Sequence, residues 1–279
     1  MLHKMIRALV ADDSAIAREV VHTGIKLHSE KRYIEIVHAS DGEQALELLK
    51  KKPIDVAFID VNMPGLNGPD VVAALQGTKS QDCLVIAISS GLSDHAEDVL
   101  SRFGAYHFLK KPFRPEDVGD IIVTYMTMTE AYPILVVDDS ATMRKLTRKI
   151  LENSRFNFEI AEAENAATAL KAVATGKFRI VLTDFHMPDM DGLELGGRIR
   201  DLSNKISIYM MSTNDTSYLE RSAAFVGLEG FLKKPFTPAD IDALMHRLLN
   251  LDDPKFGKTR DMFSFMERER RKVSTVLAS

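Results

Sequence analysis

The sequence predicts an α/β protein of two consecutive domains, each an open, doubly wound sheet of five parallel strands. Three observations predict this class. A chain of 279 residues suits two domains of ordinary size. The chain repeats its own motifs at a nearly constant distance. Short apolar runs alternate with amphipathic stretches in both halves, as successive strand–helix units require.

The internal repeat is anchored by the tetrapeptide KKPF, whose copies at 110–113 and 233–236 are 233 − 110 = 123 residues apart. Three further blocks recur in the same order: VADDSA at 10–15 and VVDDSA at 136–141, FIDVNMPGLNG at 58–68 and LTDFHMPDMDG at 182–192, and AISSG at 87–91 and MMSTN at 210–214. The offset drifts only from 126 (136 − 10) to 123 residues (210 − 87). We interpret this as a tandem duplication with small differences in loop length.

The elements of the first copy follow from these runs. Runs rich in Val, Ile and Leu suit strands that are buried on both faces of a parallel sheet, and they predict strands near 6–11, 33–39, 55–60, 83–89 and 105–109. The stretches between them have apolar residues at helical spacing and predict helices near 14–28, 42–51, 68–76, 93–103 and 115–128.

The second copy repeats this alternation. Its strands are expected near 134–138, 157–162, 179–184, 206–212 and 229–232, and its helices near 140–153, 165–175, 191–202, 216–226 and 237–250. We therefore place the domains at 1–128 and 132–250. The tail, 251–279, begins with the breakers Pro254 and Gly257 and then shows helical apolar spacing, so we expect it to be partly helical.

The composition excludes several classes of protein. A net charge of −4 gives no basic field for direct binding of nucleic acid. Cys83 is the only cysteine, which excludes an internal disulfide and a cysteine zinc cluster and fits a reducing cytoplasm. The N-terminus is a poor signal peptide, and no apolar run is long enough to span a membrane. We expect a cytoplasmic protein without a membrane contact.

The repeated polar residues all fall at the carboxyl ends of predicted strands, where open parallel sheets bind ligands. In the first copy these residues are Asp12, Asp13, Asp60, Ser89 and Lys111, and in the second they are Asp138, Asp139, Asp184, Ser212 and Lys234. Three ionised carboxylates in one place repel one another and need a cation. Mg²⁺ takes one or two carboxylates plus phosphate oxygen. One carboxylate is then free to accept a phosphoryl group, which a lysine and a hydroxyl hold.

Each motif alone has an ordinary structural explanation. Asp13 or Ser14 could cap a helix, as could Asp139 or Ser140 in the second copy. A lysine pair before proline is usually exposed, and NMPG or HMPD could be a plain turn. The joint occurrence of an acid pair, a single Asp, a hydroxyl and Lys-Pro on successive strands, twice in one chain, favours the phosphoryl site.

Both copies resemble the receiver domains of two-component response regulators. The motifs that carry the resemblance are VADDS, FIDVNMPGLNG, AISSG and FLKKPF in the first copy, and VVDDS, LTDFHMPDMDG, MMSTN and FLKKPF in the second. The resemblance covers about 1–128 and 132–250. It implies two flavodoxin-like (βα)5 domains with strand order 2-1-3-4-5. It also implies a protein that accepts phosphoryl groups and is not otherwise an enzyme.

The resemblance also implies a role for each matching residue. Asp60 and Asp184 would be the phosphoacceptors. The metal ligands would be Asp13 and Asp139 directly, Asp12 and Asp138 through water, the two acceptors, and the backbone carbonyls of Asn62 and His186. Ser89, Ser212, Lys111 and Lys234 would hold the phosphoryl group, and the aromatic switch residues would be Phe108 and Phe231. Phenylalanine lacks the hydroxyl that a tyrosine switch would offer.

The expected function is Mg²⁺-dependent phosphoryl transfer from a histidine kinase or a phosphotransfer protein. The output would be a switched protein–protein interaction with an unidentified target or a phosphoryl relay, with a homodimer as one arrangement. An alternative is the input half of a larger enzyme, such as a diguanylate cyclase with tandem receivers. A DNA-binding regulator is disfavoured because the 28 residues after Leu251 are too few for a helix-turn-helix domain. The order of the motifs also disfavours a metal-dependent phosphatase.

Overall fold

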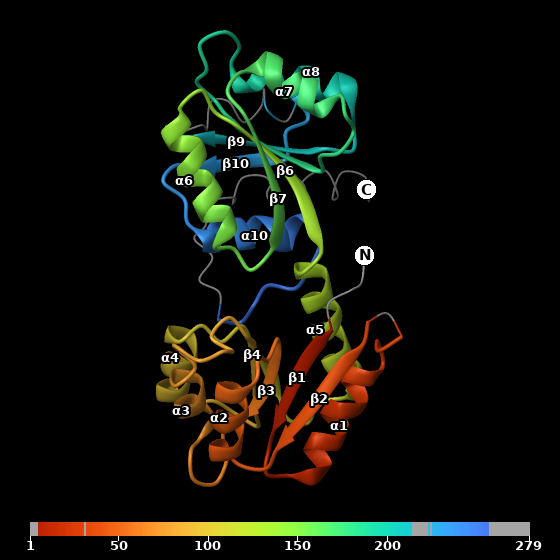
Figure 1. The fold of residues 1–279 in the computed structure, drawn as a ribbon, viewed down its shortest axis with the longest axis vertical. Helices are drawn as coiled ribbons and strands as arrows, with labels where there is room; N and C mark the ends of the chain where they lie inside the picture. The colour runs from red at the N-terminus through yellow and green to blue at the C-terminus, as the bar shows by residue number, and fades with distance from the viewer. Residues whose placement is uncertain (1–4, 31, 214–222, 224, 257–279) are drawn as a thin grey trace, which may run out of the picture. The chain divides into compact units, whose positions relative to one another are not determined.

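The structure is a computed structural model that describes residues 5–30, 32–213, 223 and 225–256. It divides into two compact units (Figure 1). Of the described residues, those up to Thr127 together with Asp252 to Phe256 form the first unit, and Met128 to Leu251 form the second.

The first unit is an alternation of strands and helices. In chain order its elements are β1 (Ile6–Ala11), α1 (Ala15–Lys26), β2 (Ile34–Ala39), α2 (Gly42–Lys51), β3 (Val56–Asp60), α3 (Gly68–Ala73), β4 (Leu84–Ser89), α4 (Asp94–Arg102), β5 (His107–Lys110) and α5 (Pro115–Met128). All strand pairs are parallel, and the order in the sheet is β2-β1-β3-β4-β5. This order makes β5 an edge strand.

The second unit repeats the same topology. Its elements are β6 (Ala131–Val137), α6 (Ala141–Glu152), β7 (Asn157–Ala163), α7 (Ala166–Val173), β8 (Ile180–Asp184), α8 (Gly192–Leu202), β9 (Ser207–Ser212), β10 (Gly230–Lys233) and α10 (Pro238–Leu248). The strand order is β7-β6-β8-β9-β10, again all parallel. The prediction of two tandem flavodoxin-like α/β domains is therefore confirmed.

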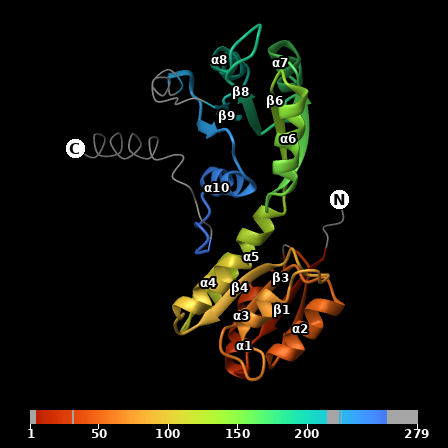
Figure 2. The same ribbon diagram turned by 90° about the vertical axis from the view of Figure 1, so that its left-hand side faces the viewer.

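Each sheet lies between two layers of helices (Figure 1, and turned by 90° in Figure 2). In the first unit, α2, α3 and α4 pack on one face around a core that includes Leu49, Val72 and Leu100. In the second unit, α7 and α8 cover one face, with Val173 and Ile199 in the core. Because helices cover both faces, β3 and β4 are buried along their whole length, which explains their unbroken apolar sequences.

The element boundaries differ from the expected ones at a few places. β6 begins at Ala131, three residues before the expected start at 134. Pro133 is tolerated there because β6 gains its second neighbour, β8, only from Ile134 onward. The helix expected at 216–226 lies mostly outside the described residues, as does the tail from 257. Among the helices that are described, none combines the length and the apolar character that crossing a bilayer requires.

Candidate metal and phosphoryl sites

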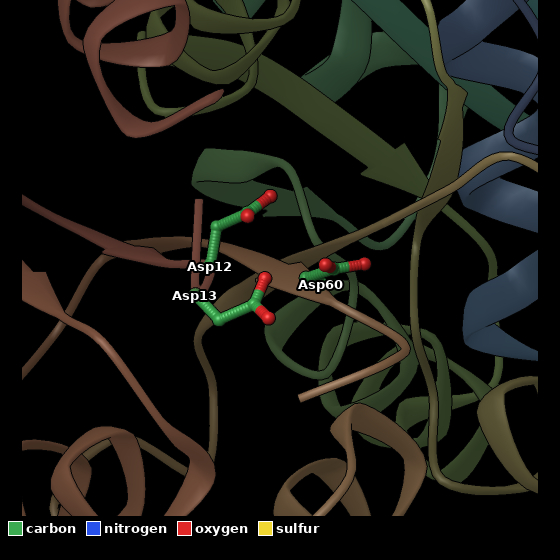
Figure 3. A group of neighbouring side chains, drawn as sticks. All are labelled: Asp12, Asp13 and Asp60. Atoms are coloured by element: carbon green, nitrogen blue, oxygen red, sulfur yellow. The ribbon is translucent and has the colours of Figure 1, made fainter. Parts of the chain in front are cut away.

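Three carboxylates meet at the carboxyl edge of each sheet. In the first unit, Asp12 and Asp13 directly follow β1, and Asp60 is the last residue of β3. Their ligand oxygens lie within 4.8 Å of one another. Figure 3 shows the three side chains as neighbours. Asp138, Asp139 and Asp184 form the same group in the second unit, so the predicted strand-end clusters exist.

The acidic loop of the first unit is held by its own backbone and by one arginine. Asp12 Oδ1 accepts a hydrogen bond from the Ser14 backbone N–H at 2.9 Å. The Ser14 hydroxyl caps α1 by accepting from the Ala17 N–H at 3.3 Å. Arg18 donates to the carbonyl oxygens of Asp12 and Asp13 at 2.6 and 3.2 Å. The helix cap is therefore Ser14, which leaves the Asp13 carboxylate available for a ligand.

The second unit repeats this arrangement with Ser140 as the cap and Arg144 as the clamp. Arg144 donates to the carbonyl oxygens of Asp138 and Asp139 at 2.7 and 3.2 Å. The sequence prediction missed both arginines. The signal that finds them is the repeat itself, since 144 − 18 gives the same offset of 126 residues that relates the two acid pairs.

A lysine bridges two carboxylates in each site. Lys111 Nζ lies 2.8 Å from Asp12 Oδ2 and 2.9 Å from Asp60 Oδ2. Its backbone N–H donates to the Ser89 carbonyl at 2.8 Å, which continues the pairing of β5 with β4. The Lys111–Pro112 peptide bond is cis. Lys111 is therefore fixed at the strand end, with its ammonium group directed at the Asp60 carboxylate.

The second lysine makes the same bridge in a more enclosed position. Lys234 Nζ lies 2.8 Å from Asp138 Oδ2 and 2.9 Å from Asp184 Oδ1. The Lys234 side chain is 9% exposed, against 28% for Lys111, whereas Asp184 is 14% exposed, against 5% for Asp60. The Lys234–Pro235 bond is also cis. The lysine–carboxylate distances are the same in the two copies, but the exposed fractions of the lysine and aspartate side chains differ.

The burial and the crowding of charge shift the pKa values of these groups. Burial raises the pKa of Asp60, the hydrogen bond from Lys111 opposes that rise, and the charge of Asp12 adds to it. For Lys111, burial alone would lower the pKa, but the hydrogen bonds to Asp12 and Asp60 outweigh burial and raise it. The pKa of Lys234 is raised in the same way by Asp138 and Asp184. Both lysines are therefore firmly cationic.

The two hydroxyl groups lie beside the acceptors. Ser89 and Ser212 are the last residues of β4 and β9, and both are buried. Ser89 Oγ donates to the Gly91 carbonyl at 2.7 Å and accepts from the Asn62 side-chain amide at 3.3 Å. His186, which corresponds to Asn62, is exposed and instead contacts the Phe185 ring, with 4.6 Å between ring centroids.

Two glycines that the sequence prediction did not single out allow a helix to approach each acceptor. A Cβ atom on Gly68 would lie 2.3 Å from the Asp60 carbonyl oxygen, and one on Gly192 would lie 2.3 Å from that of Asp184. Contacts this short with backbone atoms do not occur in folded proteins. Each glycine therefore permits α3 or α8 to start directly against the end of the acceptor strand.

The predicted switch residues lie on the edge strands and not among the carboxylates. Phe108 is on β5 and Phe231 is on β10, each three residues before the site lysine. Both rings are partly buried and pack against the core of their own unit. Each ring is connected to its site through the strand that ends directly before the lysine.

The donor set of each site fits a hard divalent cation. The ligand atoms are carboxylate oxygens from two strand ends, and Mg²⁺ binds such oxygens in preference to nitrogen or sulfur. One lysine charge leaves the three carboxylates with excess negative charge, which a divalent ion would neutralise. Acidic triads of this kind are typical of the Mg²⁺ sites of receiver domains.

Fold and site together define a doubly wound α/β module with an acidic, lysine-bridged pocket at the carboxyl edge of its sheet. The model of the response regulator receiver domain matches residues 8–123 and 134–246. Chemotaxis protein CheY-3 of Vibrio cholerae is 32% identical over 117 residues, which cover 41% of this chain and 89% of that protein. Chemotaxis protein CheY1 of Helicobacter pylori is 33% identical over 124 residues, which cover 43% and 98%.

One solved structure is similar over most of the chain. It is described as that of a putative two-component system response regulator/GGDEF domain protein, and it covers 88% of this chain and 98% of its own with a TM-score of 0.57. At 24% sequence identity, this structural likeness shows a shared fold alone. The family match and the relatives show that this chain belongs to the response regulator receiver domain family, with two such domains in tandem.

Proposed function

We propose that this protein is a response regulator that accepts phosphoryl groups on Asp60 and Asp184 from a histidine kinase or a histidine phosphotransfer protein. Receiver domains imply such a donor, and members of the family are phosphoacceptors and not classical enzymes. The observation that carries the proposal is the presence, in both units, of an acidic triad bridged by a lysine at 2.8–2.9 Å.

The transfer step balances at the acceptor carboxylate. A carboxylate oxygen of Asp60 attacks phosphorus, and the new O–P bond forms as the N–P bond of the donor phosphohistidine breaks. The electron pair of that bond returns to the imidazole, which takes up a proton from solvent. Lys111 then pairs with a phosphoryl oxygen instead of the carboxylate, and the Ser89 hydroxyl leaves the Gly91 carbonyl to donate to another.

The acid pairs would hold Mg²⁺. We assign direct ligation to Asp13 and Asp139, contact through water to Asp12 and Asp138, and further ligands to the acceptors and to the backbone carbonyls of Asn62 and His186. When bound, Mg²⁺ supplies positive charge that neutralises the carboxylates and the transferring phosphoryl group. Phe108 and Phe231 would carry the change along β5 and β10.

The output that we propose is a switched protein–protein interaction or a phosphoryl relay. The net charge of −4 gives no overall basic field that would argue for direct binding of nucleic acid. The input half of a longer diguanylate cyclase stays an alternative prediction, as does a homodimer.

Intact-mass spectrometry tests the proposal. With Mg²⁺ and acetyl phosphate, the full chain should gain up to two phosphoryl groups, and Asp60→Ala and Asp184→Ala should each remove one. Asp98→Ala and Asp201→Ala, which replace exposed helix residues, are the matched controls and should still gain two. Unchanged labelling of the double acceptor variant would show that other residues are phosphorylated.

A further inference from the structure

The segment from Asp252 to Phe256 belongs to the first unit, although it follows the second unit in the chain. Phe256 is 9% exposed and is part of the hydrophobic core cluster that contains the inner residues of β1, β3 and β4. A buried aromatic side chain is a strong anchor for a short segment. The segment is therefore packed as a component of the first receiver.

Backbone hydrogen bonds fix the segment against the edge strand of the sheet. The Phe256 N–H donates to the carbonyl of Tyr106, the residue before β5, at 3.4 Å. The Lys255 N–H donates to Nδ1 of His107, the first residue of β5, at 3.3 Å. One backbone carbonyl just before β5 and one β5 side chain thus hold the segment at the edge of the sheet.

The Lys255 side chain connects three groups on this surface. Its Nζ lies 4.5 Å from the centroid of the Phe108 ring and 5.7 Å from that of Phe256. The same atom lies 3.8 Å from Glu97 Oε1 on α4. The ammonium group thus lies over the predicted switch ring and opposite an acidic residue, which is a favourable position for a cation.

β5 connects the docked segment to the acid site, because Lys111 directly follows its last residue, Lys110. The Lys255 ammonium group lies over the Phe108 ring. Lys111, three residues after Phe108, forms ion pairs with Asp12 and Asp60. A phosphoryl group on Asp60 carries about −1.5 to −2 of charge and replaces the single charge of the carboxylate that Lys111 now binds. Lys111 then pairs with the phosphoryl group, and β5, which ends directly before Lys111, carries the Phe108 ring that lies under Lys255. β5 is therefore the path by which a change at the acid site would reach the docked segment.

We propose that the β5–α4 face formed by Glu97, His107 and Phe108 is a docking site for the segment Asp252–Phe256, and that phosphorylation of Asp60 weakens this docking. While the segment Asp252–Phe256 is docked, it blocks other proteins from binding to the β5–α4 face. Release of the segment makes this face accessible. The coupling rests on the proposed phosphoacceptor function, whereas the docking itself does not. Linkage requires the reverse effect also, so that loss of docking favours phosphorylation of Asp60.

Backbone hydrogen exchange on the full chain tests the docking first. Phe256→Ala removes the anchor, and Lys255→Glu, at a half-exposed position that leaves the core intact, places a negative charge beside Glu97. Both variants should speed exchange of the Lys255 amide and of the amide at position 256 by about tenfold or more. Phe225→Ala, at a residue that is 94% exposed in the second unit, is the matched control and should change neither. Unchanged exchange in both variants would overturn the docking site.

The coupling is tested on the same amides with Mg²⁺ and acetyl phosphate. Exchange should accelerate in the wild type and in Asp184→Ala, and stay slow in Asp60→Ala. Mass spectrometry on the same samples shows whether Asp60 carries phosphate. Phosphate on Asp60 without faster exchange would overturn the coupling alone, whereas failure to phosphorylate Asp60 would overturn the proposed function and the coupling together. The docking experiment is decided independently of both outcomes.

Discussion

The two acidic sites hold their lysines at the same distances but expose different members of the bridge. In the first site the lysine is the more accessible partner and Asp60 is nearly buried, whereas in the second site Lys234 is enclosed and Asp184 is more open. The rims differ too, since Asn62 reaches Ser89 while His186 lies against Phe185. The strand ends hold the carboxylates and the lysine in the same places in both sites. The exposure of these groups and the residues at the rim differ between the sites.

The largest expected effect concerns the bridging lysines. Lys111→Met and Lys234→Met each leave two carboxylates facing each other without their cation. We expect the affected domain to lose about 3–5 kcal/mol of its free energy of unfolding in metal-free buffer at neutral pH. The loss should be greater for Lys234, whose surroundings are drier. Urea unfolding followed by hydrogen exchange resolves the two domains.

The neighbouring lysine of each KKPF motif provides the control. Lys110 and Lys233 are exposed, so Lys110→Met and Lys233→Met should change stability little. Equal losses of unfolding free energy in Lys111→Met and Lys234→Met would contradict this prediction, because the different burial of the two lysines would then have no effect on stability.

The next effect concerns Mg²⁺ affinity. Asp13→Asn and Asp139→Asn each remove one negative charge from a triad of carboxylates. We expect the Mg²⁺ affinity of that domain to fall about tenfold or more. Calorimetric titration of the full chain, with the other site disabled by the matching acceptor variant, measures each affinity. Asp98→Asn and Asp201→Asn are controls outside the sites. Unchanged affinity in both acid-pair variants would exclude the assigned ligands.

The smallest effect concerns the lifetimes of the two aspartyl phosphates. Hydrolysis needs water in line with phosphorus, so the different rims should give lifetimes that differ by more than about twofold, or roughly 0.4 kcal/mol in barrier height. Loss of phosphate is followed after donor removal in Asp60→Ala and Asp184→Ala, each with one working site. Asn62→His should bring the first lifetime nearer to the second. Equal lifetimes would show that the rim does not control turnover.

The sequence predicted the central strands and the polar residues at the strand ends well because both follow local rules. β1, β3 and β4 match the expected strands within one residue, since strands buried on both faces are apolar along most of their length. The acids, hydroxyls and lysines fall at strand ends, which parallel topology brings to one edge. Their roles in phosphoryl transfer remain predictions.

The features that the sequence did not predict depend on contacts between distant residues. The arginine clamps Arg18 and Arg144 bind backbone carbonyls and leave no local pattern. Gly68 and Gly192 matter through the approach of a helix to a strand end. The segment Asp252–Phe256 lies in the predicted tail, and Pro254 suggested only a break in structure. Its docking depends on a surface that begins more than a hundred residues earlier, between α4 and β5.

The segment Asp252–Phe256 has a consequence for biosynthesis, because the ribosome synthesises the two parts of the first receiver at different times. The main part is complete when Thr127 has been made, but Phe256 follows only after the whole second receiver, 256 − 127 = 129 residues later. At about 5–20 residues per second, this interval is roughly 6–26 s. During that time the nascent first receiver must fold with an aromatic residue of its core missing. The Tyr106–Phe108 edge is meanwhile open to chaperones and to neighbouring chains on the same message.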